Sequence, residues 1–269
     1  MTKRILVSTV VLLVVGGMAQ AQEGELHGAV DVTNLSKYVW RGFDIYGDKS
    51  AVQPSIDIDL YGTGFGVSAM GHRANSGKYE NGERWDYTLY YGTSFYEGET
   101  YATQCRLGWV YYNYPDMGQE DMDLQEIHTI LSWPNICPSG VVPSYVLAKL
   151  WPSSSSSLVG SKSALGGTAS GFAHIFMLDY GMTIQGLLPD IPEQTLHLHS
   201  EVVFNDGVGP NGANVDHDWS NAVFGISTNF ELSEDIVLTP GVYHQMTMDS
   251  SVNGDKDETW LGLSMTYKF

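Results

Sequence analysis

Three side chains of metal-binding type lie two residues apart in one segment. His197, His199 and Glu201 occupy alternate positions, so in an extended strand all three point to the same side. Two imidazoles and a carboxylate are ligands that Zn²⁺ or Cu²⁺ accept. No second ligand cluster in the sequence completes the coordination. We therefore predict that these residues belong to a polar wall and that the protein holds no metal or other cofactor.

Carboxylates recur in the same alternating way. Asp57 and Asp59 share one face of their segment, and other acidic residues are predicted to face inwards with Arg41, Arg106 and Lys149 as counter-charges. In a narrow pore such a ladder sets a transverse field and favours cations. The alternative is that the charges form ion pairs that close the interior. The predicted lumen-lining residues are Asp31, Arg41, Asp57, Asp59, Asp86, Arg106, Glu126, His197, His199 and Glu201.

Serine and histidine occur close together twice, but neither pair suits nucleophilic catalysis. That chemistry needs the nucleophile within hydrogen-bonding reach of a base. Ser200 points away from its neighbour His199, because adjacent strand residues face opposite sides. Ser132 lies four residues beyond His128, about 13 Å along an extended chain. The sequence therefore predicts that the protein is not an enzyme.

The elements that position these side chains are predicted to be β-strands. Apolar and polar residues alternate with a period of two in most segments, and helical periodicity is nearly absent. In 259–269, one face carries mainly Leu, Met, Tyr and Phe, and the other mainly Gly, Ser, Thr and Lys. The predicted strands are residues 28–40, 51–61, 65–73, 85–96, 100–114, 124–133, 143–151, 171–180, 195–205, 219–231, 235–248 and 258–269.

The connections between these strands alternate between short turns and long polar loops, as in outer-membrane barrels. A soluble β-sandwich also has one apolar face per strand. Here the opposite face is rich in Gly, Ser, Thr and acidic residues, which suits a wet lumen. We therefore predict an all-β fold, a transmembrane antiparallel up-and-down β-barrel of about 12 strands. Aromatic residues near predicted strand ends resemble interfacial girdles: Tyr38, Trp40, Trp109 to Tyr114, Trp133, Trp151, Trp219 and Trp260.

The N-terminus predicts export. Residues 1–21 combine a basic start, a short apolar run and a small-X-small cleavage site at Ala19 and Ala21, which together are typical of a signal peptide. Residues 22–269 would then form the barrel domain in the outer membrane. The chain carries 31 Asp+Glu against 13 Lys+Arg, which argues against nucleic acid as a partner. The last residue, Phe269, resembles the insertion signal that bacterial outer-membrane proteins present to the barrel-assembly machinery.

Two sequence segments resemble the opening of the TorF family of putative porins. They are Ser36-Lys37-Tyr38-Val39-Trp40-Arg41-Gly42 and Ala51-Val52-Gln53-Pro54-Ser55-Ile56-Asp57, and 84–89 looks like the fourth strand of that family. Lys37 stands where the family usually has Asp, and Trp40 where it usually has Phe. The resemblance covers roughly the first 70 mature residues. It implies a porin-like outer-membrane barrel and says little about the solute.

Cys105 and Cys137 are predicted near the periplasmic side, where an oxidising compartment allows a disulfide; two free thiols are the alternative. Acidic outer loops could bind Ca²⁺ or bridge lipopolysaccharide through divalent ions, but they match no defined loop motif and a solvated surface is the favoured interpretation. The Ser- and Gly-rich loop 152–170 is a candidate constriction of the mouth. We predict a channel for passive diffusion of small hydrophilic solutes or ions, weakly cation-preferring, with outer-membrane lipid and lipopolysaccharide around it. The alternative is a non-conducting structural or adhesive barrel that acts through its outer loops. The oligomeric state stays open.

Overall fold

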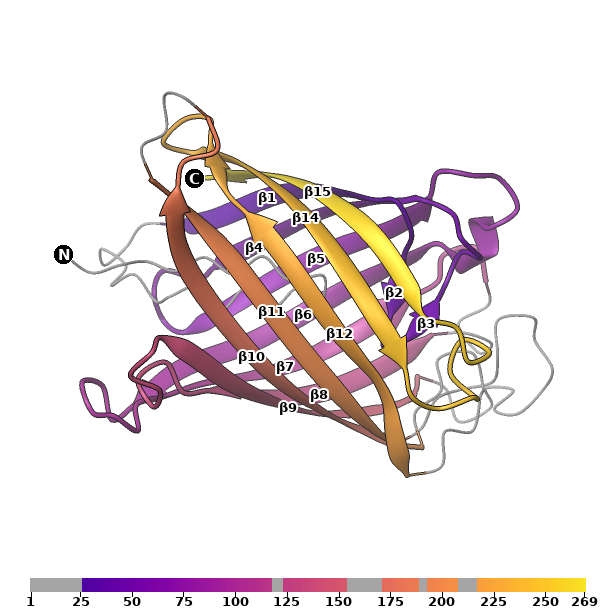
Figure 1. The fold of residues 1–269 in the computed structure, drawn as a ribbon. Helices are drawn as coiled ribbons and strands as arrows, with labels where there is room; N and C mark the ends of the chain where they lie inside the picture. Colours follow the sequence, from indigo (N-terminus) through magenta and orange to yellow (C-terminus); the bar gives the residue numbers. More distant parts are fainter. Residues whose placement is uncertain (1–25, 118–122, 154–170, 189–192, 208–216) are drawn as a thin grey trace.

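The chain folds into a closed antiparallel β-barrel, shown by a computed structural model that describes residues 26–117, 123–153, 171–188, 193–207 and 217–269 (Figure 1). Twelve long strands pair with their neighbours in chain order, and β1 pairs with β15 to close the ring. The predicted up-and-down barrel is thereby confirmed. The predicted signal peptide lies outside the described residues. The long strands are β1 (His27–Leu35), β4 (Ala51–Asp59), β5 (Phe65–Ala74), β6 (Arg84–Phe95), β7 (Thr103–Asn113), β8 (Leu124–Ser132), β9 (Val141–Pro152), β10 (Gly171–Gln185), β11 (Glu193–Asp206), β12 (Asp218–Thr228), β14 (Ile236–Thr247) and β15 (Glu258–Lys268).

The barrel presents its apolar side chains outward. In β6, Trp85, Tyr87 and Leu89 are exposed on the outer surface, and they alternate with Asp86 and Thr88, which line the interior. The same apolar belt continues over the other long strands, with exposed residues on most of them and half-buried outward residues on β9 and β11. An apolar exterior around a polar interior is the arrangement of a barrel that faces lipid. The chain is therefore a transmembrane barrel of the outer-membrane type. Among the described residues, no helix has the length and hydrophobicity that crossing a bilayer requires.

The two ends of the barrel differ. At the end where the chain terminates, the connections are short, as at 60–64 and 229–235; we call it the turn end (Figure 1). At the opposite end, here the loop end, the connections are longer, as at 36–50 and 248–257. The predicted alternation of short and long connections is thus present in the fold.

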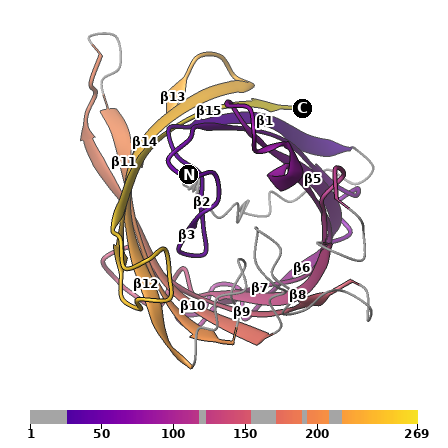
Figure 2. The same cartoon turned by 90° about the vertical axis from the view of Figure 1, so that its right-hand side faces the viewer.

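The first predicted strand, 28–40, is wrong at its C-terminal end. β1 ends at Leu35, and the chain then turns into the barrel instead of continuing along the wall. Residues 36–50, which we call the inward hairpin, contain the short strands β2 (Val39–Trp40) and β3 (Phe43–Asp44). Figure 2 shows these two strands inside the ring of the barrel.

Several aromatic residues predicted for the interfacial girdles lie in the interior. Tyr38, Trp40, Tyr112 and Trp260 are all buried, whereas Trp109 and Trp219 are exposed on the outer surface. The reason is that Tyr38 and Trp40 belong to the inward hairpin and that Tyr112 and Trp260 occupy inward positions of their strands. A further boundary differs: the predicted strand 219–231 is interrupted after Thr228, and Phe230–Glu231 forms the short strand β13.

Candidate functional site

The inward hairpin is built around a tight turn. Arg41 and Gly42 have φ values of 50° and 93°, which two-residue hairpin turns of type I′ require at both central positions. A Cβ atom at Gly42 would lie 2.8 Å from Asn221 Oδ1 and 2.8 Å from Val252 Cγ1, so only glycine fits. Gln245 Nε2 donates to the carbonyl oxygen of Gly42 at 2.8 Å. The tip of the hairpin is therefore fixed against β12 and β14.

Aromatic rings of the inward hairpin pack against the barrel wall. Tyr38 stacks on His72 with ring centroids 5.0 Å apart, and Trp40 meets the edge of Tyr112 at 5.5 Å. The hydroxyl of Tyr46 donates to the carbonyl oxygens of His72 at 2.9 Å and Gly82 at 3.1 Å. Tyr38 and Tyr46 are buried. Burial raises the pKa of both phenols, so both stay neutral: the Tyr46 hydroxyl is a hydrogen-bond donor, and the Tyr38 hydroxyl accepts from Arg84.

Arg41 connects the tip of the inward hairpin to β8. Its guanidinium forms an ion pair and a hydrogen bond with Glu126, and both side chains are buried. Glu126 also accepts a hydrogen bond from the Tyr112 hydroxyl at 2.9 Å and lies 3.0 Å from His128 Nδ1. A buried carboxylate needs such compensation, because moving one ion from water into a protein interior costs on the order of several kcal/mol. Arg41 and Glu126 therefore anchor the hairpin inside the lumen.

Arg84 forms a second buried centre on β6. Its guanidinium donates to both carboxylate oxygens of Asp86, at 2.6 Å and 2.9 Å, and to the Tyr38 hydroxyl at 3.0 Å. The same guanidinium lies 4.1 Å from the centroid of the Trp40 ring, a distance at which a cation is attracted to the ring face. His72 Nε2 completes the group at 2.9 Å from Asp86. This centre binds the base of the hairpin to β5 and β6.

Arg106 forms a third, looser pair nearer the turn end. Its Nη2 lies 3.7 Å from Asp57 Oδ2, and its guanidinium lies 3.6 Å from the centroid of Tyr90. The Tyr90 hydroxyl donates to Asp57 at 2.7 Å. Three arginines and their carboxylates thus follow one wall of the lumen from the inward hairpin towards the turn end.

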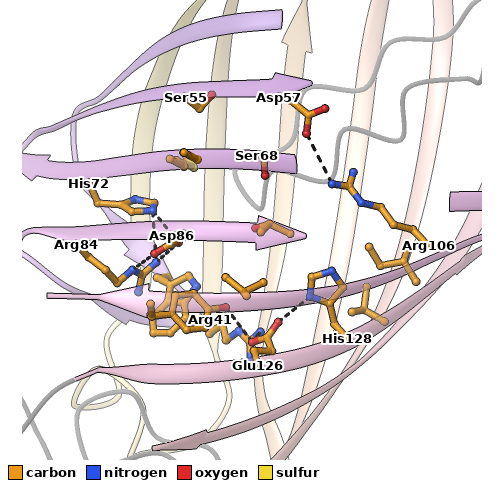
Figure 3. A pocket seen from close by; sticks show the side chains of 18 of the residues that line it. Arg41, Ser55, Asp57, Ser68, His72, Arg84, Asp86, Arg106, Glu126 and His128 are labelled. Atoms are coloured by element: carbon orange, nitrogen blue, oxygen red, sulfur yellow. Dashed lines mark hydrogen bonds and ion pairs between the residues drawn. The ribbon is translucent and has the colours of Figure 1, made fainter. Parts of the chain in front are cut away.

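A cavity of about 140 Å³ lies between these groups and the opposite wall (Figure 3). Its polar side carries Arg41, Arg106 and His128, which Figure 3 shows pointing into the same space. Its other side is apolar: Ile130 and Val146 line it together with Ile175 and Met177. The lumen at this level therefore has one charged wall and one mainly apolar wall, on which Glu201 is the acidic exception.

The three residues predicted to form a polar wall on β11 do face the interior. His199 Nδ1 lies 2.7 Å from Asp179 Oδ1 on β10, and its Nε2 lies 3.7 Å from Glu201 Oε2. His197 makes a different contact, with Asn229 Nδ2 at 3.4 Å. Asp179 was not among the predicted lumen residues. The group consists of side chains paired with one another along the wall.

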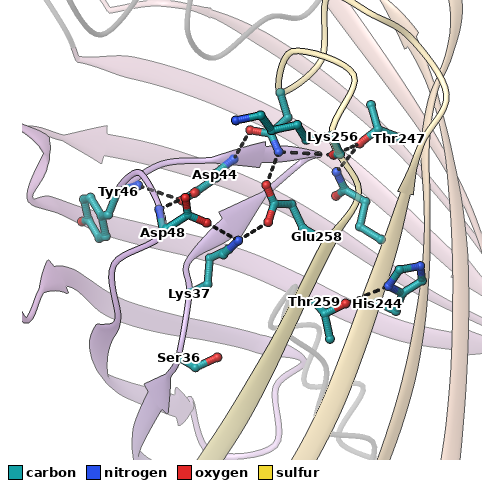
Figure 4. Close-up of polar contacts among 12 residues, drawn as sticks. Ser36, Lys37, Asp44, Tyr46, Asp48, His244, Thr247, Lys256, Glu258 and Thr259 are labelled. Carbon is teal, nitrogen blue, oxygen red and sulfur yellow. Dashed lines mark hydrogen bonds and ion pairs between the residues drawn. The ribbon is translucent and has the colours of Figure 1, made fainter.

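A cluster of oxygen ligands is instead found at the loop end (Figure 4). Carboxylate oxygens of Asp44, Asp48 and Glu258 lie within 4.8 Å of one another. The Lys37 ammonium forms ion pairs with both Asp48 and Glu258, so the cluster already has a cation. Burial lowers the pKa of Lys37, but its hydrogen bonds to Asp48 and Glu258 outweigh this effect and the pKa is raised. The same hydrogen bond from Lys37 lowers the pKa of the Asp48 carboxyl. Lys37 therefore fastens the inward hairpin to β15.

The remaining predicted lumen residues are Asp31 and Asp59. Asp31 accepts hydrogen bonds from Thr33 at 2.6 Å and Thr266 at 2.7 Å. Asp59 accepts from the backbone N–H of Gly62 at 2.5 Å. Asp59 thus caps a turn at the turn end, whereas Asp57 belongs to the Arg106 pair.

One prediction about an individual side chain is corrected, and for the two cysteines the structure shows the second of the alternatives left open. Lys149 is not an inward counter-charge: inward positions of β9 are taken by Ala148 and Leu150, which are fully buried, and Lys149 alternates with them. Cys105 and Cys137 are free thiols. Cys105 alternates with the lumen-lining Arg106 on β7 and so faces outward, whereas Cys137 lies in the turn after β8.

The sequence did not reveal the ion pairs that form around the inward hairpin. Arg84, His72 and Lys37 were not identified, although each makes a buried or half-buried ion pair. One signal was available: the pair Arg41-Gly42 is flanked by Trp40 and Phe43, a pattern that suits a hairpin turn between two apolar positions. The loop 152–170 was proposed as the constriction, and 154–170 lies outside the described residues.

Comparison with solved structures finds outer-membrane porins and channels. The NanC porin superposes with a TM-score of 0.53 at 11% identity, covering 89% of this chain and 100% of that chain. The KdgM porin superposes with a TM-score of 0.51 at 9% identity, covering 90% of this chain and 99% of that chain. An outer-membrane channel from Pseudomonas putida superposes with a TM-score of 0.52 at 12% identity, covering 92% of this chain and 96% of that chain. At these identities the likeness concerns the fold, which is that of an outer-membrane barrel. No family model and no curated protein matches the chain, so its resemblance to the TorF family stays a prediction.

Proposed function

We propose that the protein is an outer-membrane channel for passive diffusion of small hydrophilic solutes, with the inward hairpin as its constriction. The observation that carries the proposal is the polar lumen with a hairpin held inside it by Arg41 and Glu126. A barrel that served only as an anchor would not need charged side chains along a wet interior. The porin and channel neighbours have the same fold, which agrees with this function.

We also propose a weak preference for cations. On the described strands, acidic inward residues outnumber arginine and lysine, and only part of the acidic charge is paired with a cation. Asp31 and Asp59, for example, accept hydrogen bonds from neutral donors alone. A ring or row of carboxylates raises the local concentration of cations in a narrow pore.

The second candidate is a non-conducting barrel that acts through its outer loops. A specific observation favours it: Ile130, Val146, Ile175 and Met177 form a buried apolar cluster inside the barrel with Val203. An apolar constriction can close a pore by excluding water.

Single-channel recording of the refolded mature protein in a planar bilayer, with a KCl gradient, distinguishes the two candidates. Discrete conductance steps with a reversal potential on the cation side support the channel. A correctly folded barrel that never conducts would exclude the channel and favour the structural role. Steps with an anion-side reversal potential would retain the channel and refute the cation preference.

A further inference from the structure

Lys149 is an unusual residue on the outer surface of the barrel. It lies on β9 three positions before the strand ends at Pro152, and its register partners are Ile127 on β8 and Phe172 on β10. Both partners are exposed apolar residues of the outer belt. A lysine on the lipid-facing side is costly near the bilayer midplane and tolerated near the interface, so its position requires an explanation.

The other charged residues on the outer faces of the described strands lie at strand ends and form ion pairs. Arg73 is the penultimate residue of β5 and pairs with Glu83 at 3.0 Å. Asp206 is the last residue of β11 and pairs with His217. In contrast, Lys149 has no carboxylate within ion-pair distance in the described part of the chain. Its Nζ lies 4.5 Å from the centroid of the Phe172 ring.

The surroundings of Lys149 place it at the level of the membrane interface. Trp109 lies on the same outward row, opposite Ile127, and Trp151 follows Lys149 at the next outward position of β9. The indole nitrogen of Trp109 donates to Gln125 at 3.1 Å. Tryptophan and hydrogen-bonding side chains gather where lipid headgroups begin, and a lysine stem lies along apolar surface while its ammonium reaches towards that layer.

We propose that Lys149 is the centre of a binding site for the phosphate group of an outer-leaflet lipid. The occupant follows from charge complementarity: an ammonium that has no carboxylate partner among the described residues, at headgroup depth and on a surface that faces only lipid, meets phosphate as the available anion. Phe172 supplies a ring face beside the ammonium, and the exposed belt around it contacts the acyl chains. The site is independent of whether the lumen conducts.

The test compares two lipids that differ only in phosphate. The refolded mature protein, in a neutral detergent, is titrated with a phosphorylated lipid A and with the same lipid A after removal of its phosphates, and bound lipid is counted by native mass spectrometry. We expect wild type to retain the phosphorylated lipid preferentially. Lys149→Gln should bind it about fivefold more weakly, the effect of about 1 kcal/mol per lysine near a membrane surface.

Two control variants make the outcome specific. Lys149→Arg keeps the charge and should retain the preference, and Arg73→Gln removes a charge that is already paired and should leave binding unchanged. Equal binding of the two lipids by wild type would overturn the proposal. It would also be overturned if Lys149→Gln and Arg73→Gln lost affinity to the same extent, because the effect would then be general surface charge.

Discussion

Removing Arg41 should release the inward hairpin from the lumen. Arg41→Ala takes away the cation of Glu126 and leaves a carboxylate that is 3% exposed within the barrel. Breaking a buried ion pair by deleting one partner costs about 3–5 kcal/mol. Tyr112 and His128 still contact Glu126, at 2.9 Å and 3.0 Å, so we use the lower end of that range.

A loss of about 3 kcal/mol changes the ratio of docked to released hairpin by about a hundredfold. In single-channel recordings, the time spent in a higher-conductance state should therefore rise by about a hundredfold in Arg41→Ala relative to wild type. Arg73→Ala is the matched control, because its pair with Glu83 is exposed and such pairs contribute about 0–1 kcal/mol.

The double variant Arg41→Gln/Glu126→Gln separates the ion pair from the shape of the site. It removes both charges and keeps groups that can hydrogen-bond, so no uncompensated charge stays buried. We expect it to restore most of the docked state. Heat-modifiability on gels checks that the barrel of Arg41→Ala is folded. If that folded variant has the same open times as wild type, the idea that this pair anchors the hairpin is refuted.

Three further predictions concern charge and thiols. Asp57→Asn should shift the reversal potential further towards anions than Asp59→Asn, because it also removes the carboxylate that offsets the charge of Arg106; equal shifts would contradict this reasoning. The lowered pKa of Asp48 means that its pair with Lys37 stabilises the hairpin above the ordinary aspartate pKa of 3.8 and is lost as pH falls through the lower folded value. Open times should therefore rise below about 4, and Asp48→Asn should lessen the rise by removing the contribution of this pair. Both cysteine thiols should react with a maleimide reagent in the unfolded, unreduced protein, and a mass without two labels would contradict the free thiols.

The sequence by itself determined the class of fold. Strand alternation is a local property, because each side chain points opposite to its neighbour whatever the rest of the chain does. The twelve strands, and the position of Asp57, Glu126 and Glu201 on the more polar face of their strands, therefore followed from spacing alone. The alternation of short and long connections then selected a barrel.

The tertiary structure decided everything that depends on which strands face one another across the lumen. Whether residues 36–40 extend β1 or turn inward depends on distant partners: Glu126 for Arg41, and Arg84 for Tyr38. These contacts join residues far apart in the chain, and no local pattern encodes them. For the same reason, alternation could place Lys149 on one of two faces, but only the closed barrel showed which face is lipid and which is lumen.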